Sequence, residues 1–297
     1  MAQAALHSST SQNSLYATAI GVIAVLLWSC LALLTTLTEG IPAFQLLALS
    51  FAVAFMASVG VIGCRGVEGF KQWRQPWAVW VTGFGGIFAY HALYFYALKV
   101  APAAQASLIA YLWPLLIVLL SALAARQGLQ WRQVLGALLG LAGTAFILQQ
   151  RNEAQLLQTP WLGYAAAFGC ALVWSSYSVI NRRFRGVSSN VIGAICGLVT
   201  VAGGVCHGLF ETWVPPTAPQ WAAIVGLGLG PVGLAFFAWD HATKHGSLGM
   251  LGALSYLAPL VSTLLLIAVG ASPANPMLLI AAGLIIAGAA LATLRTR

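Results

Sequence analysis

The sequence feature that most limits the possible folds of this 297-residue chain is a series of ten long apolar runs separated by short breaks. A run of about 20 apolar residues crosses the hydrocarbon core of a bilayer as a helix, because backbone groups in lipid must pair within the segment. Only 6% of the residues are charged, against about 25% in a soluble domain. We therefore predict an all-α polytopic membrane protein. The expected spans are 15–37, 41–63, 77–98, 101–124, 131–149, 161–181, 188–210, 220–243, 247–270 and 276–294.

The same composition excludes several classes of protein. So few charges rule out a soluble enzyme, and the high apolar content rules out a disordered chain. The five cysteines are an odd number and show no C-x-x-C or other metal-ligand spacing, which argues against both a disulfide framework and a metal site. The net charge is +8, but the basic residues do not cluster as they do on a nucleic-acid-binding surface. We expect no metal, no cofactor and no nucleic-acid partner; lipid surrounds the protein.

The distribution of Lys and Arg predicts the orientation. If the N-terminus is cytoplasmic, 11 of the 13 Lys and Arg residues fall on the cytoplasmic side, and only Lys99 and Arg151 fall outside. Residues 1–14 lack Lys and Arg, so they read as a cytoplasmic tail and not as a signal peptide. Both termini are expected inside. The 11 residues are Arg65, Lys71, Arg74, Arg126, Arg132, Arg182, Arg183, Arg185, Lys244, Arg295 and Arg297.

The two halves of the chain resemble each other at an offset of 145–146 residues. YLWPLL at 111–116 aligns with YLAPLV at 256–261, and LLWSC at 26–30 aligns with LVWSS at 172–176. Each repeat holds five spans, an odd number, so the second copy is expected to be inverted in the membrane around a central cavity. Inverted repeats are typical of alternating-access carriers. We expect repeats at 15–149 and 161–297, joined by a periplasmic linker at 150–160.

Aromatic and polar residues far from both interfaces are the candidate binding groups. Trp usually prefers the interface, so central Trp residues suggest the lining of a cavity, although large aromatics also fill cores. Hydroxyls and one imidazole accompany them. His91 is the candidate for proton coupling, and a histidine with one backbone partner in the core is an equal alternative. The candidates are Trp28, His91, Tyr94, Tyr111, Trp113, Trp174, Ser255 and Tyr256.

Two prolines and two lysines occupy matching places in the repeats. Pro114 and Pro259 remove a backbone donor and free a carbonyl one turn earlier, which predicts helix kinks at a transport site or plain packing kinks. Lys99 and Lys244 are expected at the two mouths of the cavity, as electrostatic guides or as ordinary snorkelling residues. Asp240 lies near the cytoplasmic end of its span, and no Asp or Glu lies mid-span. The predicted substrate is therefore neutral or zwitterionic.

With these spans, repeats and motifs, the chain resembles the drug/metabolite transporter superfamily and, within it, the EamA-type exporters. The stretch AYHALYFYALKVAPAAQASLIAYLWPLL at 89–116 resembles the aromatic amino acid branch. The resemblance implies export of Phe, Tyr, Trp and other neutral amino acids across the bacterial inner membrane. It assigns binding roles to His91, Tyr94, Tyr111, Trp113, Trp174 and Ser255.

Other functions remain open at this stage. Export of a different neutral or zwitterionic metabolite or drug is the first alternative, and a passive channel is another. A membrane-embedded enzyme would need a completed site, whereas His241 and His245 beside Asp240 lack a third metal ligand. We therefore expect no enzymatic activity. A monomer is one expectation for the oligomeric state.

Overall fold

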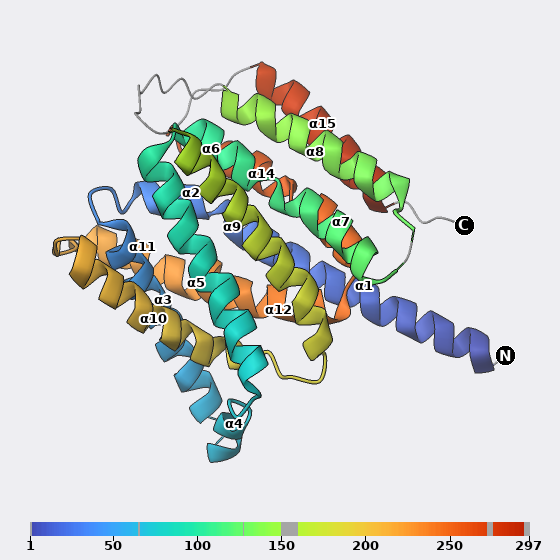
Figure 1. Cartoon of the computed structure of the whole chain (residues 1–297), viewed down its shortest axis with the longest axis horizontal. Helices are drawn as coiled ribbons and strands as arrows, with labels where there is room; N and C mark the ends of the chain where they lie inside the picture. Colours follow the sequence, from blue (N-terminus) through green and yellow to red (C-terminus); the bar gives the residue numbers. More distant parts are fainter. Residues whose placement is uncertain (1, 65, 127, 150–159, 272–275, 294–297) are drawn as a thin grey trace.

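The computed structural model describes residues 2–64, 66–126, 128–149, 160–271 and 276–293, and every regular element in them is helical (Figure 1). The expected linker lies outside the described residues, except for Pro160. The elements are α1 Ala2–Ser29, α2 Leu31–Thr36, α3 Ala43–Gly63, α4 Val67–Lys71, α5 Trp77–Val100, α6 Ala103–Ala110, α7 Trp113–Ala124, α8 Trp131–Gln149, α9 Pro160–Ile180, η1 Asn181–Phe184, α10 Val191–Phe210, α11 Ala218–Leu227, η2 Gly228–Leu234, α12 Ala235–His245, α13 Leu248–Leu254, α14 Leu257–Ala268 and α15 Met277–Thr293.

Eight helical segments in the described part of the chain are long and apolar enough to cross a membrane. Two shorter apolar helices, Trp131–Ile147 and Met277–Ala292, occupy the places of the fifth and tenth expected spans. The protein is thus an all-helical, multi-pass membrane protein. The residues of the expected tail are helical from Ala2 onward, because α1 begins there and runs without a break into the first span. No Pro or Gly precedes Gly21 to stop that helix.

Local sequence signals explain where the helices begin. Pro42, Pro76 and Pro102 are the N-caps of α3, α5 and α6, and α9 starts at Pro160. The fixed φ of proline and its missing N–H suit the first positions of a helix. α11 begins with a capping box, in which the backbone N–H of Thr217 donates to Gln220 Oε1 at 2.8 Å.

The fourth, eighth and ninth spans are each interrupted by a break or a widened turn. α6 ends at Ala110 and α7 begins at Trp113, with Pro114 in its first turn. α13 and α14 are separated at Ser255 and Tyr256, just before Pro259. The eighth span contains the π-helical turn η2, which holds Pro231. A π turn inside an α-helix leaves backbone carbonyls outside the regular ladder and is frequent at functional sites.

Helices from the two halves of the chain pack against one another. α5 lies along α9, α3 along α10, and α1 along α12, while α8 and α15 lie side by side at one edge of the molecule (Figure 1). Glycines permit the close approach of α8 and α15: a Cβ on Gly136 would lie 2.5 Å from the carbonyl oxygen of Gly288. A Cβ on Gly143 would lie 2.8 Å from the carbonyl oxygen of Ala281.

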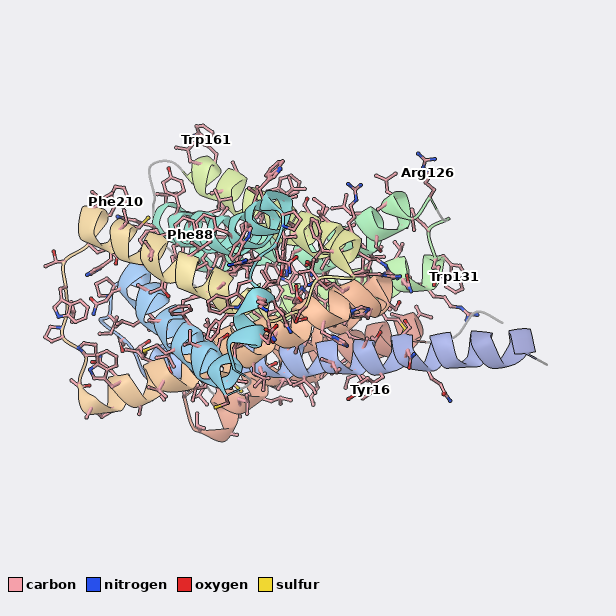
Figure 2. The ribbon with its side chains drawn as sticks, turned by 90° about the horizontal axis from the view of Figure 1, so that it is seen from below. Tyr16, Phe88, Arg126, Trp131, Trp161 and Phe210 are labelled. Carbon is pink, nitrogen blue, oxygen red and sulfur yellow. The ribbon has the colours of Figure 1, made fainter. Side chains whose placement is uncertain are left out.

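The two ends of the helical body differ in the residues that they expose. Arg126 and Trp131 lie toward the end from which the N-terminal part of α1 projects, whereas Trp161 and Phe210 lie toward the opposite end (Figure 2). Trp131 is 61% exposed and Trp161 is 64% exposed. Exposed tryptophans near both ends are what membrane interfaces favour, and the long axis of the spans runs between them.

Candidate functional site: an aromatic centre

Four tryptophans meet at the centre of the molecule. Trp28 comes from α1, Trp113 from α7, Trp174 from α9 and Trp239 from α12. All six pairs of rings are in contact, with centroid separations from 5.1 Å for Trp28–Trp239 to 6.4 Å for Trp28–Trp113. These separations lie in the range of favourable edge-to-face and stacked pairs. We call these four residues the tryptophan cluster.

Two hydrogen bonds fix the indole groups of this cluster. Trp28 Nε1 donates to the carbonyl oxygen of Pro231 at 3.0 Å, and that carbonyl belongs to the π turn of η2. Trp239 Nε1 donates to Ser178 Oγ at 3.1 Å. A buried indole N–H needs such a partner, since an unpaired donor in an apolar interior is costly. The irregular turn in the eighth span therefore supports the aromatic centre directly.

A second group of rings surrounds the tryptophan cluster. Phe236 lies 5.9 Å from Trp28 and 6.2 Å from His91, measured between ring centroids. Tyr90 lies 5.4 Å from Trp174. His91 Nδ1 lies 2.7 Å from the carbonyl oxygen of Ile87, so Nδ1 carries the hydrogen and donates it. In the neutral ring, Nε2 is then an acceptor.

The rings fill the space at the centre instead of lining an open chamber. Trp113, Trp174 and Trp239 are 7%, 4% and 0% exposed. We expected these aromatics around a central cavity. In the structure they contact one another, so the aromatic centre is closed in this conformation.

The hydroxyl groups of three other expected binding residues are hydrogen-bonded within the protein. Tyr94 OH and Ser107 Oγ are 2.9 Å apart, which ties α5 to α6. Ser255 is fully buried, and its hydroxyl donates to Leu251 of the same helix at 2.6 Å. Tyr256 is also buried; it packs against Gly140 of α8 and donates to the carbonyl oxygen of Tyr111 at 3.1 Å. Neither of these last two hydroxyls is available to a ligand in this arrangement.

One expectation is wrong: Lys244 does not lie at a cavity mouth. Its side chain is 1% exposed, and Nζ donates to Asp240 Oδ2 at 2.7 Å and to the carbonyl oxygen of Val187 at 3.0 Å. Asn181 Nδ2 also donates to Asp240 Oδ1 at 2.9 Å. The i,i+4 spacing on α12 brings the two charges together, and burial requires such a pair. Lys99, the matching residue, is exposed at the end of α5.

Sequence reasoning missed Trp239 and Phe236, although the repeat offers a signal for both. At the offset of 145 residues, His91 corresponds to Phe236 and Tyr94 to Trp239. The two positions singled out in the third span thus have aromatic partners in the eighth. Applying the offset to each candidate residue would have found them.

A helical membrane protein whose two halves contribute interlocking helices and a shared aromatic centre has the organisation of a membrane transporter. Comparison with known proteins identifies its family. The chain belongs to the EamA-like transporter family, which matches it twice, over residues 15–149 and 161–294. The family consists of transporters, so the protein is not an enzyme.

Individual relatives are similar over nearly the whole chain. The aromatic amino acid exporter YddG of Ancylobacter novellus is 48% identical over 282 residues, covering 95% of this chain and 98% of that protein. A probable terminal-alkyne amino-acid exporter of Streptantibioticus cattleyicolor is 25% identical over 281 residues, covering 93% and 92%. A crystal structure with 47% sequence identity superposes with a TM-score of 0.89 and covers 94% of this chain and 96% of its own.

Proposed function

We propose that this protein exports aromatic and other neutral amino acids across the bacterial inner membrane, by alternating access through the aromatic centre. The tryptophan cluster is the observation that carries the proposal. It is contributed by four helices from both halves, and its rings offer flat apolar faces to an aromatic side chain. The name of the 48% identical relative, an aromatic amino acid exporter, points to the same class of substrate.

The proposed architecture is ten spans in two inverted repeats, with both termini cytoplasmic. Residues that correspond at the repeat offset contact each other across the centre. Trp28 and Trp174 lie 5.6 Å apart and His91 and Phe236 lie 6.2 Å apart, between ring centroids. Tyr256 OH likewise donates to the backbone of Tyr111, its own counterpart. Such contacts are expected where a two-fold axis in the membrane plane exchanges the repeats.

Opening of the cluster would create the binding site. The indole rings would then form walls for the substrate side chain, together with Tyr94 and Tyr111. His91 is the proposed partner of the substrate ammonium group, because Nδ1 already donates to Ile87 and Nε2 is left to accept. The Ser255 hydroxyl now donates to the carbonyl oxygen of Leu251 in α13. Ser255 would therefore bind substrate only after the geometry of the break between α13 and α14 changes.

A second candidate is export of another neutral or zwitterionic amino acid with an unusual apolar side chain. The relative named as a probable terminal-alkyne amino-acid exporter supports it, as it covers 93% of this chain. The same aromatic walls would accept an alkyne, because they recognise apolar bulk and not a particular ring.

Transport by purified protein in proteoliposomes tests the proposal. We expect saturable uptake of radiolabelled tryptophan or phenylalanine that bulky neutral amino acids inhibit and that Glu and Lys do not. Substrate loaded on the opposite side should accelerate uptake, which separates a carrier from a channel. Trp113→Ala should abolish uptake, whereas Trp161→Ala, a matched change at an exposed position, should not. Normal uptake by Trp113→Ala would refute the aromatic site.

A further inference from the structure

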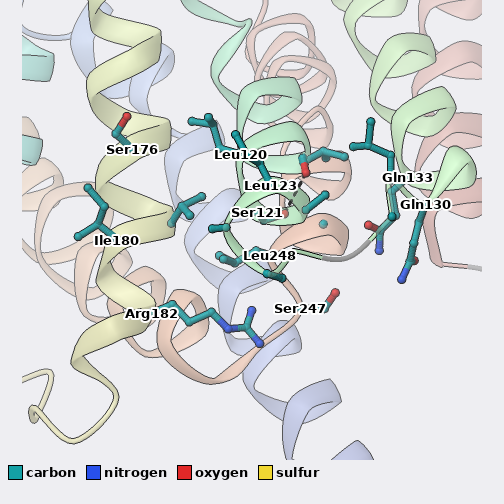
Figure 3. A pocket seen from close by; sticks show the side chains of 18 of the residues that line it. Leu120, Ser121, Leu123, Gln130, Gln133, Ser176, Ile180, Arg182, Ser247 and Leu248 are labelled. Carbon is teal, nitrogen blue, oxygen red and sulfur yellow. Dashed lines mark hydrogen bonds between the residues drawn. The ribbon is translucent and has the colours of Figure 1, made fainter.

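A cavity of about 670 Å³ lies between α7, α9 and the start of α13, away from the tryptophan cluster (Figure 3). The start of α8 and the segment before it complete its wall. The lining includes Val118 but none of the four tryptophans. Val118 is five residues beyond Trp113, so this lining residue lies about 7.5 Å along α7 from the cluster, toward the end that holds Arg126.

The polar side of this cavity is basic. Arg182 and Arg183 both line it, and Arg182 Nη1 donates to the carbonyl oxygen of Gly246 at 3.2 Å, which holds the guanidinium at the cavity (Figure 3). Gln133 and Ser247 add neutral polar groups beside it. All of the lining residues lie in the described part of the chain, and none of these is acidic. The positive charge at this side of the cavity therefore favours an anionic ligand, and a guanidinium pairs well with phosphate oxygens.

The other side of the cavity is apolar and open. Leu120 and Leu123 come from α7, and Val179 and Ile180 come from α9. Leu123 is 75% exposed and Ile180 is 39% exposed. A basic group at one end and an exposed aliphatic wall at the other match a molecule with an anionic head and long hydrocarbon chains. A small soluble anion would use only the first of these features.

The position of the cavity along the membrane normal further limits which molecules can occupy it. Arg126, Arg182 and Arg183 lie at this end, and the expected topology counts all three among the 11 Lys and Arg residues on the cytoplasmic side, so we assign this end to the cytoplasm. The cytoplasmic leaflet is the anionic one, and basic pockets between transmembrane helices on that side bind lipid headgroups. We propose that the cavity binds an anionic phospholipid, with its phosphate at Arg182 and Arg183 and its acyl chains along α7 and α9. The inference depends on the orientation and not on the transported substrate.

Binding of defined lipids to the purified protein tests this site. The protein is placed in vesicles of phosphatidylcholine with 0–30% phosphatidylglycerol, and retained lipid is measured by native mass spectrometry and by thermal stability. The test variant is Arg182→Gln with Arg183→Gln. The matched control is Lys71→Gln with Arg74→Gln, which removes the same charge from exposed positions at the end of α4 and just after it, outside the cavity. We expect about 30-fold weaker phosphatidylglycerol binding in the test variant alone, at about 1 kcal/mol for each cation.

Three results would overturn the proposal. Equal losses in the test and control variants would show general surface attraction. Saturation of the cavity by inorganic phosphate alone, competing with phosphatidylglycerol, would show a soluble-anion site. Unchanged phosphatidylglycerol binding in the single variant Arg183→Gln, whose exposed side chain is not needed for folding, would remove the headgroup assignment even if the double variant fails to fold.

Discussion

The buried pair Asp240–Lys244 allows a test of how α12 is held against the neighbouring residues Asn181 and Val187. The perturbation is a cycle of Asp240→Asn, Lys244→Met and the double change. Each single change leaves one buried group without its main partner. Asp240 would keep only the Asn181 amide, and Lys244 would keep only the carbonyl of Val187. The double change removes both charges and preserves side-chain volume.

The expected magnitudes follow from burial. The two side chains are 1% and 2% exposed and 2.7 Å apart, so solvent cannot compensate a lost partner. Removing one member of such a pair costs about 3–5 kcal/mol, whereas replacing both with uncharged groups is close to neutral. The surface pair Lys71–Glu68 is 61% and 77% exposed and serves as the matched control. Its loss should cost under about 1 kcal/mol.

The assay is thermal unfolding in detergent, followed by the fraction of protein that remains monodisperse on size exclusion. Both single variants should melt far below the wild type, and the double variant should recover most of the loss. Coupling of this kind is the signature of a direct interaction. The argument would be refuted if the losses of stability in the two single variants added up in the double variant. It would also be refuted if each single change cost no more stability than the loss of the Lys71–Glu68 pair.

Three further perturbations address other parts of the structure. Trp239→Ala should lower the free energy of unfolding by roughly 3–5 kcal/mol and abolish transport, as measured by thermal melts and vesicle uptake. Gly288→Leu should prevent α8 and α15 from packing and yield aggregated protein, whereas Gly283→Leu, on an open side of α15, should purify normally. A cysteine at Lys99 should react with an impermeant thiol reagent applied outside intact cells, and one at Arg183 should not. Reversed labelling would overturn the orientation.

Much of the fold was predictable because span length and apolar composition are strong signals. The third span was expected at 77–98 and is Trp77–Val100, and the seventh was expected at 188–210 and is Val191–Phe210. The eighth span was expected as one helix. It contains a π turn because Pro231 cannot donate within it and because Gly228 packs closely against α3, a contact that only the tertiary structure reveals.

The site was predictable in its residue type but not in its detail. Trp28, Trp113 and Trp174 were chosen because tryptophan is unusual in the middle of a span, and the structure brings them together. Trp239 contacts all three but is not among the residues that the sequence predicts. The burial of Lys244 could not be read from its place near a span end, because it depends on Asp240 one turn earlier and on the loop at Val187.

The Asp240–Lys244 pair has no counterpart in the first half of the chain. This asymmetry bears on the proposed equilibrium between the inward-open and outward-open states of the transporter. Under the proposed repeats, the contact between Trp28 and Trp174 maps onto itself, so a change there affects both states alike. The counterparts of Asp240 and Lys244 are Phe95 and Lys99, which form no such pair. A ligand or mutation shifts a conformational equilibrium only through a difference between its states. Under the proposed alternating access, a change to the ion pair is therefore expected to shift the equilibrium between the two open states, whereas a change at the Trp28–Trp174 contact is not.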